Sequence, residues 1–257
     1  MEEDQKQHML NFLAQGRRLD GRNKDEFRKI EITPNISVNA EGSAGVKIGE
    51  TEVYAGVKMS VDKPYPDIPD EGVLMTGAEL YPLSSPEFEP GPPSIQGIEL
   101  ARVIDRGIRE AGAINTKELC IRAGEKVWMV MVDIVTINDA GNLFDASGIA
   151  AGVALKNAVF PKIENDIVEY GTKTDKKLPL KELPVSITVI KIGEHYLVDP
   201  TTEEEKMLDA RLTVAVRGDG AICAMQKGGN MPVTEEDISA MVDLAMEKAK
   251  EVRGMLP

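Results

Sequence analysis

The stretch from Trp128 to Phe160 constrains the fold more than any other part of the sequence. It begins with a run of large and β-branched apolar residues, Trp128 to Val135, which only Asp133 interrupts. Such runs are typical of a strand that is covered on both faces, so we expect a central strand here. The residues from Asn138 to Asn142 tolerate turn and left-handed conformations, so the chain should reverse after the strand.

An alanine-rich helix should follow this turn. Small and aliphatic residues recur at helical spacing, namely Ala146, Ile149, Ala150, Val153, Ala154 and Ala158. Their small size would allow the helix to lie close against the sheet. Asp145 falls in the first turn of this helix, where free backbone N–H groups and the helix dipole favour an anion. The sequence therefore predicts a buried strand, a turn and a buried helix.

Composition and charge exclude several classes of protein. The chain of 257 residues is 42% hydrophobic and 28% charged, which is ordinary for a globular protein. Its N-terminus lacks the apolar segment of a signal peptide, and no stretch approaches the roughly 18 apolar residues of a membrane span. We therefore expect a cytoplasmic protein with no membrane contact. The formal net charge of -13 argues against a free-standing nucleic-acid binder, so any contact with RNA must be local.

Cysteine and histidine are too scarce for most metal or nucleophile chemistry. Cys120 and Cys223 are isolated in the sequence, and His8 and His195 are the only histidines. Zinc sites, disulfide frameworks and Ser/His/Asp triads need more of these residues, or closer spacing between them. We expect no metal and no cofactor.

Two charged clusters have both a structural and a functional interpretation. Arg17, Arg18 and Arg22 could form a surface loop held by ion pairs, which is favoured, or could meet phosphates. The carboxylates of Glu203 to Glu205 with Asp209 could hold a divalent cation or share a proton. A solvated turn is favoured for them, because exposed glutamate is the norm.

A third cluster lies on a helix predicted to begin after the N-cap Ser94 and to end at Gly112, with isoleucines on its apolar side. Arg102, Arg106 and Arg109 fall within about 60° of arc on this helix, so they share one face. In one interpretation, carboxylates three or four residues away pair with them and the face is solvated. In the other, the planar guanidinium groups form a surface for RNA phosphates.

The remaining segments predict two similar β-rich halves, each of strands followed by a helix. We expect an antiparallel meander of four strands (37–40, 43–48, 51–60 and 72–81), then two hairpins (185–198 and 212–225) and a last helix (235–253). An amphipathic helix near the N-terminus should dock on the protein, and the charged segment from Glu164 to Leu183 should be an exposed connection. The expected organisation is an N-terminal helix and basic turn over 1–30, an N-terminal domain over 31–163 and a C-terminal domain over 184–254.

Several of these stretches together resemble the RNase PH family of phosphorolytic 3′-exoribonucleases. The matching pieces are Arg18-Leu19-Asp20-Gly21-Arg22, Gly42-Ser43 with Gly49-Glu50-Thr51-Glu52-Val53, IELARVIDRGIRE from Ile98, and the strand and turn from Val132 to Asn142 with its helix. Their order and spacing extend over nearly the whole chain. The resemblance implies an α/β fold of the α+β kind, the RNase PH-like fold, which is also called ribosomal protein S5 domain 2-like.

Two further stretches are similar to the non-catalytic RNase PH-like subunits of the archaeal exosome. They are FEPGPP before the arginine-bearing helix and VDPTTEEEKMLDARLTVAV at 198–216. This resemblance implies a catalytic RNase PH-like partner in a hetero-hexameric ring built as a trimer of heterodimers. It also implies RNA-binding cap subunits and RNA itself as partners.

The departures from the family pattern imply that the chain has no catalytic residues of its own. Phosphorolytic members carry Gly-Thr-Arg where this chain has Leu143-Phe144-Asp145, and the carboxylate of Asp145 should repel phosphate. An aspartate pair of active members corresponds here to Glu205 and Arg211. Acid or metal-assisted catalysis through that pair should be lost.

The arginine-bearing helix retains the basic character of the family. The resemblance implies that Arg102 and Arg106, and less directly Arg109, face RNA. We therefore expect a structural, RNA-contacting exosome subunit that supports a partner's active site. The alternative is a self-sufficient phosphorolytic 3′-exoribonuclease. A small-molecule phosphotransferase on a related βαβ fold is disfavoured, because the glycine-rich phosphate loop is missing.

Overall fold

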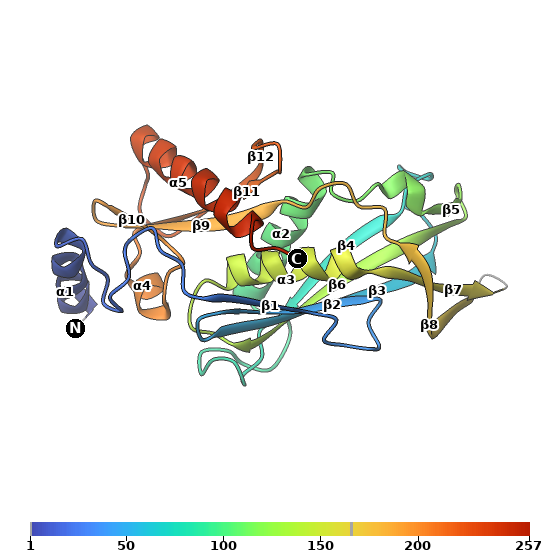
Figure 1. Ribbon diagram of the computed structural model, residues 1–257, viewed down its shortest axis with the longest axis horizontal. Helices are drawn as coiled ribbons and strands as arrows, with labels where there is room; N and C mark the ends of the chain where they lie inside the picture. Colours follow the sequence, from blue (N-terminus) through green and yellow to red (C-terminus); the bar gives the residue numbers. More distant parts are fainter. Residues whose placement is uncertain (1, 165–166) are drawn as a thin grey trace.

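The structure is a computed structural model that describes residues 2–164 and 167–257. Two β-sheets lie on either side of a pair of helices, and a further helix covers the outer face of the second sheet (Figure 1). Because the layers alternate, one large core cluster extends through both sheets, and a smaller cluster forms at α1.

The first sheet has six strands, in the order β1-β2-β3-β6-β4 with β5 beside β6. Its strands are β1 (Ile30–Pro34), β2 (Gly42–Ile48), β3 (Thr51–Asp62), β4 (Val73–Glu79), β5 (Cys120–Arg122) and β6 (Lys126–Asn138), and a 3-10 helix (Thr116–Leu119) precedes β5. All pairs are antiparallel except β4 and β6, which run parallel. The long strand β6 lies between β3 and β4, so its predicted central place is confirmed.

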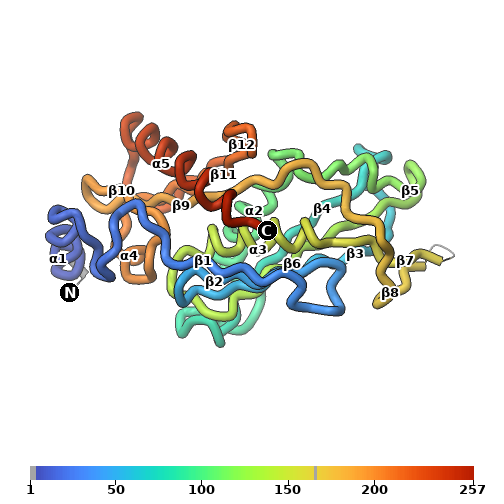
Figure 2. The backbone as a smooth tube through the Cα atoms, in the orientation of Figure 1, coloured from blue at the N-terminus to red at the C-terminus, as the bar shows by residue number. Residues whose placement is uncertain are grey.

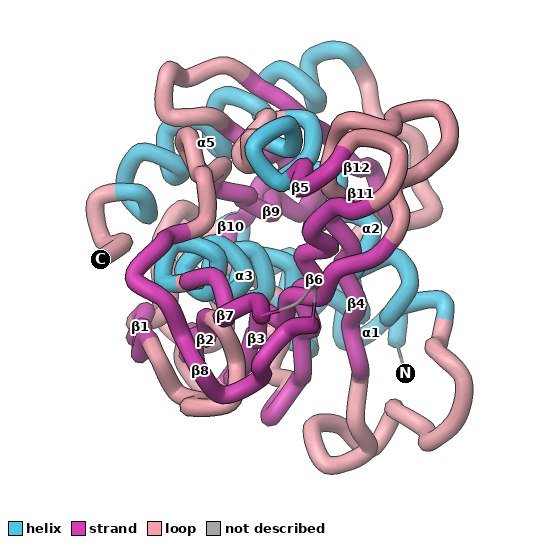
Figure 3. Tube along the Cα trace, turned by 90° about the vertical axis from the view of Figure 1, so that its right-hand side faces the viewer, coloured by secondary structure: helices cyan, strands magenta, loops and turns pink. Residues whose placement is uncertain are grey.

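Two helices form the middle layer. Helix α3 (Leu143–Asn157) packs against β2 and β3 below and β9 above, as Figure 3 shows from the side. Its alanines and glycines let it approach both sheets closely. Helix α2 (Ile95–Glu110) lies beside it and contacts β4 and β12.

The second sheet has four strands in the order β10-β9-β11-β12. They are β9 (Val185–Ile192), β10 (His195–Val198), β11 (Ala210–Val216) and β12 (Ile222–Gly228), and α5 (Glu235–Arg253) packs on β9 and β11. The two predicted hairpins and the last helix are confirmed.

The two ends of the molecule carry small additional elements. Helices α1 (Glu2–Ala14) and α4 (Thr202–Met207) lie near β10 at one end, and the hairpin of β7 (Val159–Glu164) and β8 (Ile167–Lys177) extends at the other (Figure 2). Met9 and Leu13 of α1 are buried against Ile190, Ile192 and Leu197. The predicted docking of the N-terminal helix is confirmed.

The expectation that the central strand is covered on both faces is wrong. On β6, Val130, Val132 and Ile134 are buried, whereas Met129 and Met131 between them are only partly buried and Asp133 is exposed. Both middle-layer helices lie on one face of this sheet, so the described residues leave the other face partly open to solvent. The apolar run therefore corresponds to a strand with one buried face and one partly exposed face.

Several predicted boundaries and pairings were also wrong. No strand forms at 37–40 in the described chain, because the edge strand is the earlier β1; β4 pairs in parallel with β6 and does not extend the meander. The predicted connection from Glu164 holds strand β8, and its residues 165–166 lie outside the described residues. On α2, Ile95 and Ile98 are exposed rather than apolar core. Each error concerns a non-local contact that local patterns do not encode.

Gly42 is the point where β2 and α3 approach most closely, and this generates a prediction. A Cβ atom there would lie 2.2 Å from the Ala154 carbonyl oxygen and 2.7 Å from Ala158 Cα. We expect Gly42→Ala to lower the free energy of unfolding by about 2 kcal/mol or more, since backbone must move. The matched control is Gly56→Ala on β3, where a Cβ meets only Ala40 at 3.8 Å and the change should stay within about 0.5 kcal/mol. Equal effects in urea unfolding would contradict this account.

Candidate functional site

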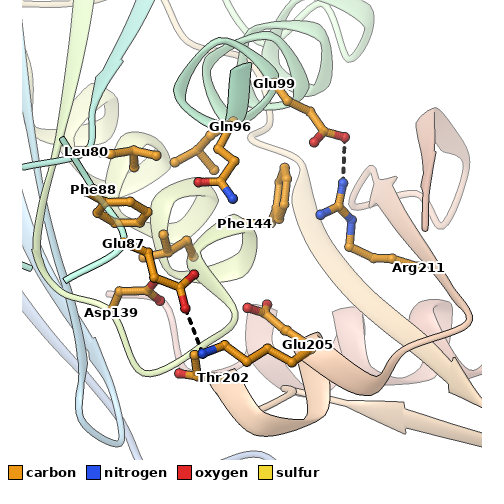
Figure 4. Close-up of a pocket in the computed structure, with 13 residues that line it drawn as sticks. Leu80, Glu87, Phe88, Gln96, Glu99, Asp139, Phe144, Thr202, Glu205 and Arg211 are labelled. Atoms are coloured by element: carbon orange, nitrogen blue, oxygen red, sulfur yellow. Dashed lines mark hydrogen bonds and ion pairs between the residues drawn. The ribbon is translucent and has the colours of Figure 1, made fainter. Parts of the chain in front are cut away.

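A cavity of about 210 Å³ lies where the start of α3 faces α4 and the beginning of β11 (Figure 4). Its lining comes from both halves of the chain: the proline-rich loop before α2, α2 itself, the turn before α3, α4 and β11. Leu143 and Phe144 line it from α3, and Glu205 and Arg211 from the second half. These are four of the five positions at which the sequence departs from the phosphorolytic pattern.

A strained turn places the start of α3 against the second half. Asn142, the N-cap residue, has a left-handed backbone with φ 62° and Gly141 has φ 91°. A Cβ at Gly141 would lie 2.5 Å from the Pro200 carbonyl oxygen, so only glycine fits between the two segments. The turn is therefore pressed against the residues that lead into α4.

The backbone N–H groups of this turn bind the chain's own carboxylates. Gly141 N–H donates to Asp139 Oδ1 at 3.0 Å, and Asn142 N–H donates to Glu205 Oε1 at 2.9 Å. Donors of this kind at a helix start are the usual partners of a bound anion. Here Glu205 reaches across from α4 and takes the place that an external anion would use.

The carboxyl groups of Asp139 and Glu205 lie in surroundings that disfavour their ionised forms. Burial raises the pKa of Glu205 to about 7, against the bond from Asn142, and the nearby Asp139 contributes in the same direction. Burial likewise raises the pKa of Asp139, with a smaller contribution from Glu87. The cavity already carries more negative charge than its surroundings stabilise.

The cations at the cavity are already paired. The Arg211 guanidinium lies 4.1 Å over the Phe144 ring and forms an ion pair of 2.5 Å with Glu99. Lys206 forms an ion pair of 2.7 Å with Glu87. Each of these two cations therefore already has a carboxylate partner at the cavity.

The expected repulsion of phosphate by Asp145 is corrected by the geometry. The side chain is fully buried, and it does not line the cavity. It accepts a hydrogen bond from Asn142 Nδ2 at 3.0 Å, and burial raises its pKa to about 7. The third residue of the helix points into the core, so the carboxyl groups that lie at the helix start are those of Glu205 and Asp139 instead.

A buried ion network ties the basic turn to the second half. Arg18 is buried and donates to Glu204 Oε1 at 2.8 Å and to the Val198 carbonyl oxygen at 2.9 Å. Both favoured interpretations of these clusters, an exposed loop and a solvated turn, are wrong for Arg18 and Glu204. Ion pairing does hold the turn, but inside the protein, which a local charge pattern could not reveal.

Arg28 and Asp199 were missed by sequence reasoning. Arg28 forms an ion pair of 2.7 Å with buried Asp199 and donates to the Ala140 and Gly141 carbonyl oxygens at 2.8 and 3.0 Å. Although burial opposes it, the Arg28 guanidinium lowers the pKa of Asp199. These residues fix the turn before α3, yet nothing in their sequence neighbourhood distinguishes them from ordinary surface charges.

The three arginines of α2 differ in their surroundings. Arg109 forms two hydrogen bonds of 3.0 Å with Asp105 and a third with the Leu74 carbonyl oxygen. Arg106 is exposed and contacts only Gln226 Oε1, at 3.3 Å. Arg102 is exposed, and no hydrogen bond or ion pair to it is found within the described ranges. Arg102 and Arg106 are therefore the guanidinium groups that can still accept a new partner.

The described part of the chain contains neither a cluster of metal-ligating side chains nor a membrane-spanning helix. No three His, Cys, Asp or Glu side chains come together as a metal site there. Among the same residues, no helix is both long and apolar enough to span a membrane.

Comparison with known families matches both halves of the chain. Residues 26–161 match domain 1 of the 3′ exoribonuclease (RNase PH) family, and residues 182–248 match domain 2. The chain belongs to this family. The predicted family and the predicted fold class are thereby confirmed.

Relatives of similar length carry the name exosome complex component Rrp42. The one from Methanosarcina acetivorans is 46% identical over 250 residues, covering 97% of this chain and 92% of the relative. The one from Archaeoglobus fulgidus is 48% identical over 246 residues, covering 96% and 93%. These similarities extend through both domains of the family.

Solved structures give the same result. A chain of the Archaeoglobus fulgidus exosome with RNA bound to the active site has a TM-score of 0.93 and 46% identity, covering 100% of this chain and 99% of that one. A chain of an archaeal exosome core has a TM-score of 0.88 and 42% identity, covering 99% and 97%. The arrangement of layers thus belongs to a known fold.

The burial of Asp145 predicts a specific dependence of stability on pH. In the unfolded chain its pKa is about 3.9, whereas in the folded protein it is about 7. The folded state therefore binds more protons between these values, and stability should fall as the pH rises from about 4 to 7. We expect Asp145→Asn to weaken this fall and to raise the Tm at pH 8 by about 2 °C or more.

Thermal unfolding followed by circular dichroism at pH 5 and pH 8 measures the effect. Asp243→Asn, at an exposed position on α5, is the matched control and should leave the pH dependence unchanged. A lower Tm of Asp145→Asn at pH 8 would show that the ionised carboxylate stabilises the fold.

Proposed function

We propose that this chain is a non-catalytic, RNA-contacting subunit of an exosome ring in the cytoplasm. Its partner would be a catalytic RNase PH-like subunit, alternating with it as a trimer of heterodimers, with RNA-binding cap subunits on the ring. The observation that carries the proposal is the hydrogen bond of 2.9 Å from Asn142 N–H to Glu205, which fills the anion position at the start of α3.

The electrostatics of the cavity argue against phosphate binding. Glu87, Glu99, Asp139 and Glu205 line it, and the two cations there are paired with the first two of these carboxylates. Burial raises the pKa of Glu205 to about 7, so this group is ionised only in part at neutral pH, and its ionised form would repel an anion. In either form, inorganic phosphate would have to displace Glu205 from the Asn142 N–H. Since phosphorolysis requires bound phosphate, the cavity supports a subunit without its own chemistry.

The outer face of α2 supports an RNA contact. Ile95, Ile98, Arg102 and Arg106 lie along one exposed stripe, which we call the α2 stripe. Its arginine end has two guanidinium groups available for bidentate bonds to phosphate oxygens. Its isoleucine end exposes apolar surface of the kind found at subunit interfaces. A partner on the isoleucines would bring its RNA next to the arginines.

The similarity to exosome chains supports the proposed partners. The relatives named Rrp42 match almost the whole length of this chain, and one structural relative is part of an exosome with RNA bound to the active site. The net charge of -13 also fits a chain that meets RNA only as part of a larger assembly.

Reversing the charge of the α2 stripe tests the RNA contact. We expect Arg102→Glu with Arg106→Glu to slow RNA degradation by the assembled ring about tenfold or more, because two phosphate contacts become repulsive. The slope of log affinity against log salt should also decrease by about two. The matched control is Arg122→Glu on β5, at the far end of the first sheet, which should change neither quantity.

Size-exclusion chromatography must show that the double variant still assembles. Unchanged RNA decay and an unchanged salt slope in the intact ring would assign the α2 stripe to ordinary solvated surface.

The absence of chemistry in this chain is tested without a partner. We expect the purified chain, mixed with RNA and inorganic phosphate, to release no nucleoside diphosphate above a protein-free control. Chromatography of the products measures this. Robust release would support the alternative, a self-sufficient phosphorolytic 3′-exoribonuclease.

A further inference from the structure

A second, larger cavity lies beside α3 and is separate from the site described above. Its volume is about 460 Å³, within the range of small-molecule pockets. Three segments enclose it: one face of α3, the stretch 177–185 that connects β8 to β9, and the end of α5 with Leu256 after it. It shares no lining residue with the cavity at the start of α3.

The floor of this cavity is aliphatic. Ile149 and Val153 of α3 are buried there, and Leu178, Leu183 and Val185 line the opposite wall. Gly152 of α3 leaves space on this side of the helix: a Cβ there would meet only Leu183 Cδ1, at 3.9 Å.

The rim of the cavity is basic. Lys156, Lys177, Lys181 and Arg253 line it, together with Glu182, which forms an ion pair of 3.8 Å with Arg253. Lys156 donates to a backbone oxygen of Pro257, and Arg253 donates to the carbonyl oxygens of Leu183 and Val216 at 2.8 Å each. Lys177 and Lys181 are exposed, and their ammonium groups make no contact with other described residues. In a protein of net charge -13, a rim of this sign is a local exception.

The aliphatic floor of the cavity favours an aliphatic anion over single-stranded RNA as its ligand. Single-stranded RNA binds through stacking of its bases on aromatic side chains, together with cationic contacts to phosphate. None of the described residues that line this cavity is aromatic. An aliphatic chain, by contrast, fills such a floor without needing polar partners. The anionic group of the ligand would then lie at the lysines.

We propose that this cavity binds an aliphatic carboxylate, with the hydrocarbon between α3 and residues 178–185 and the carboxylate at Lys177 and Lys181. The site is independent of the ring function proposed above, because it uses neither the cavity at the start of α3 nor the α2 stripe. It makes the segment between the two domains part of a ligand site.

Titration calorimetry of the full chain with octanoate tests the proposal, with octylammonium as the probe of opposite charge. We expect octanoate to bind with one site per chain and to raise the Tm, since a ligand of the folded state stabilises it. Octylammonium should produce neither effect. Equal binding of the two probes, or no binding of octanoate, would overturn the proposal.

Variants locate the binding site. Lys177→Glu with Lys181→Glu should weaken octanoate binding by about tenfold or more, because attraction becomes repulsion at the rim. Gly152→Met should abolish binding by filling the cavity, while Gly152→Ala, which adds only an ordinary contact, should retain most of it. Circular dichroism must show that each variant is folded; if Gly152→Met is not, the lysine pair decides. Octanoate binding that survives both the filling and the charge reversal would place the ligand elsewhere.

Discussion

One buried ion network fixes the relative positions of the N-terminal segment, the turn before α3 and the segment before α4. Asp199, in a left-handed conformation with φ 46°, is fully buried and receives Arg28, Arg22 and the amide of Asn142. Arg18 adds the bidentate bond to Glu204, which also caps α4. Breaking such a network would leave uncompensated buried charge. The N-terminal segment, the turn before α3 and the segment before α4 are thus fixed to one another.

The cavity at the start of α3 is a consequence of this fixation. Because the turn is held against Pro200, α4 stands where Glu205 reaches the Asn142 N–H. The helix start therefore differs from the phosphorolytic pattern in two ways. It lacks the arginine, and the carboxyl group of Glu205 occupies it. Leu143 and Phe144 cover the remaining surface, and Phe144 supports the Arg211 guanidinium. The backbone donors at this helix start are thereby satisfied by carboxyl groups of the chain itself.

Local sequence patterns predicted most helices, strands and turns, but they did not predict which residues are buried or how β4 pairs. The strand, turn and helix from β6 to α3, the N-cap Ser94 and both C-terminal hairpins follow from periodicity and turn residues. Which face of β6 is covered, the parallel pairing of β4, and the burial of Arg18 and Asp145 depend on contacts between distant residues. Family resemblance identified positions 145, 205 and 211, but could not show that Asp145 points into the core. Arg28 and Asp199 carried no local signal.

The α2 stripe has a further consequence in a protein so acidic. At physiological ionic strength the Debye length is about 8 Å, so two exposed arginines are felt only by molecules almost in contact with them. At greater distances an approaching polyanion meets the field of a chain with a net charge of -13. If the α2 stripe contacts RNA as proposed, it would not capture RNA from solution; it would retain a strand that something else has already delivered. The stripe would then act on how long RNA stays, and hardly at all on how quickly it arrives.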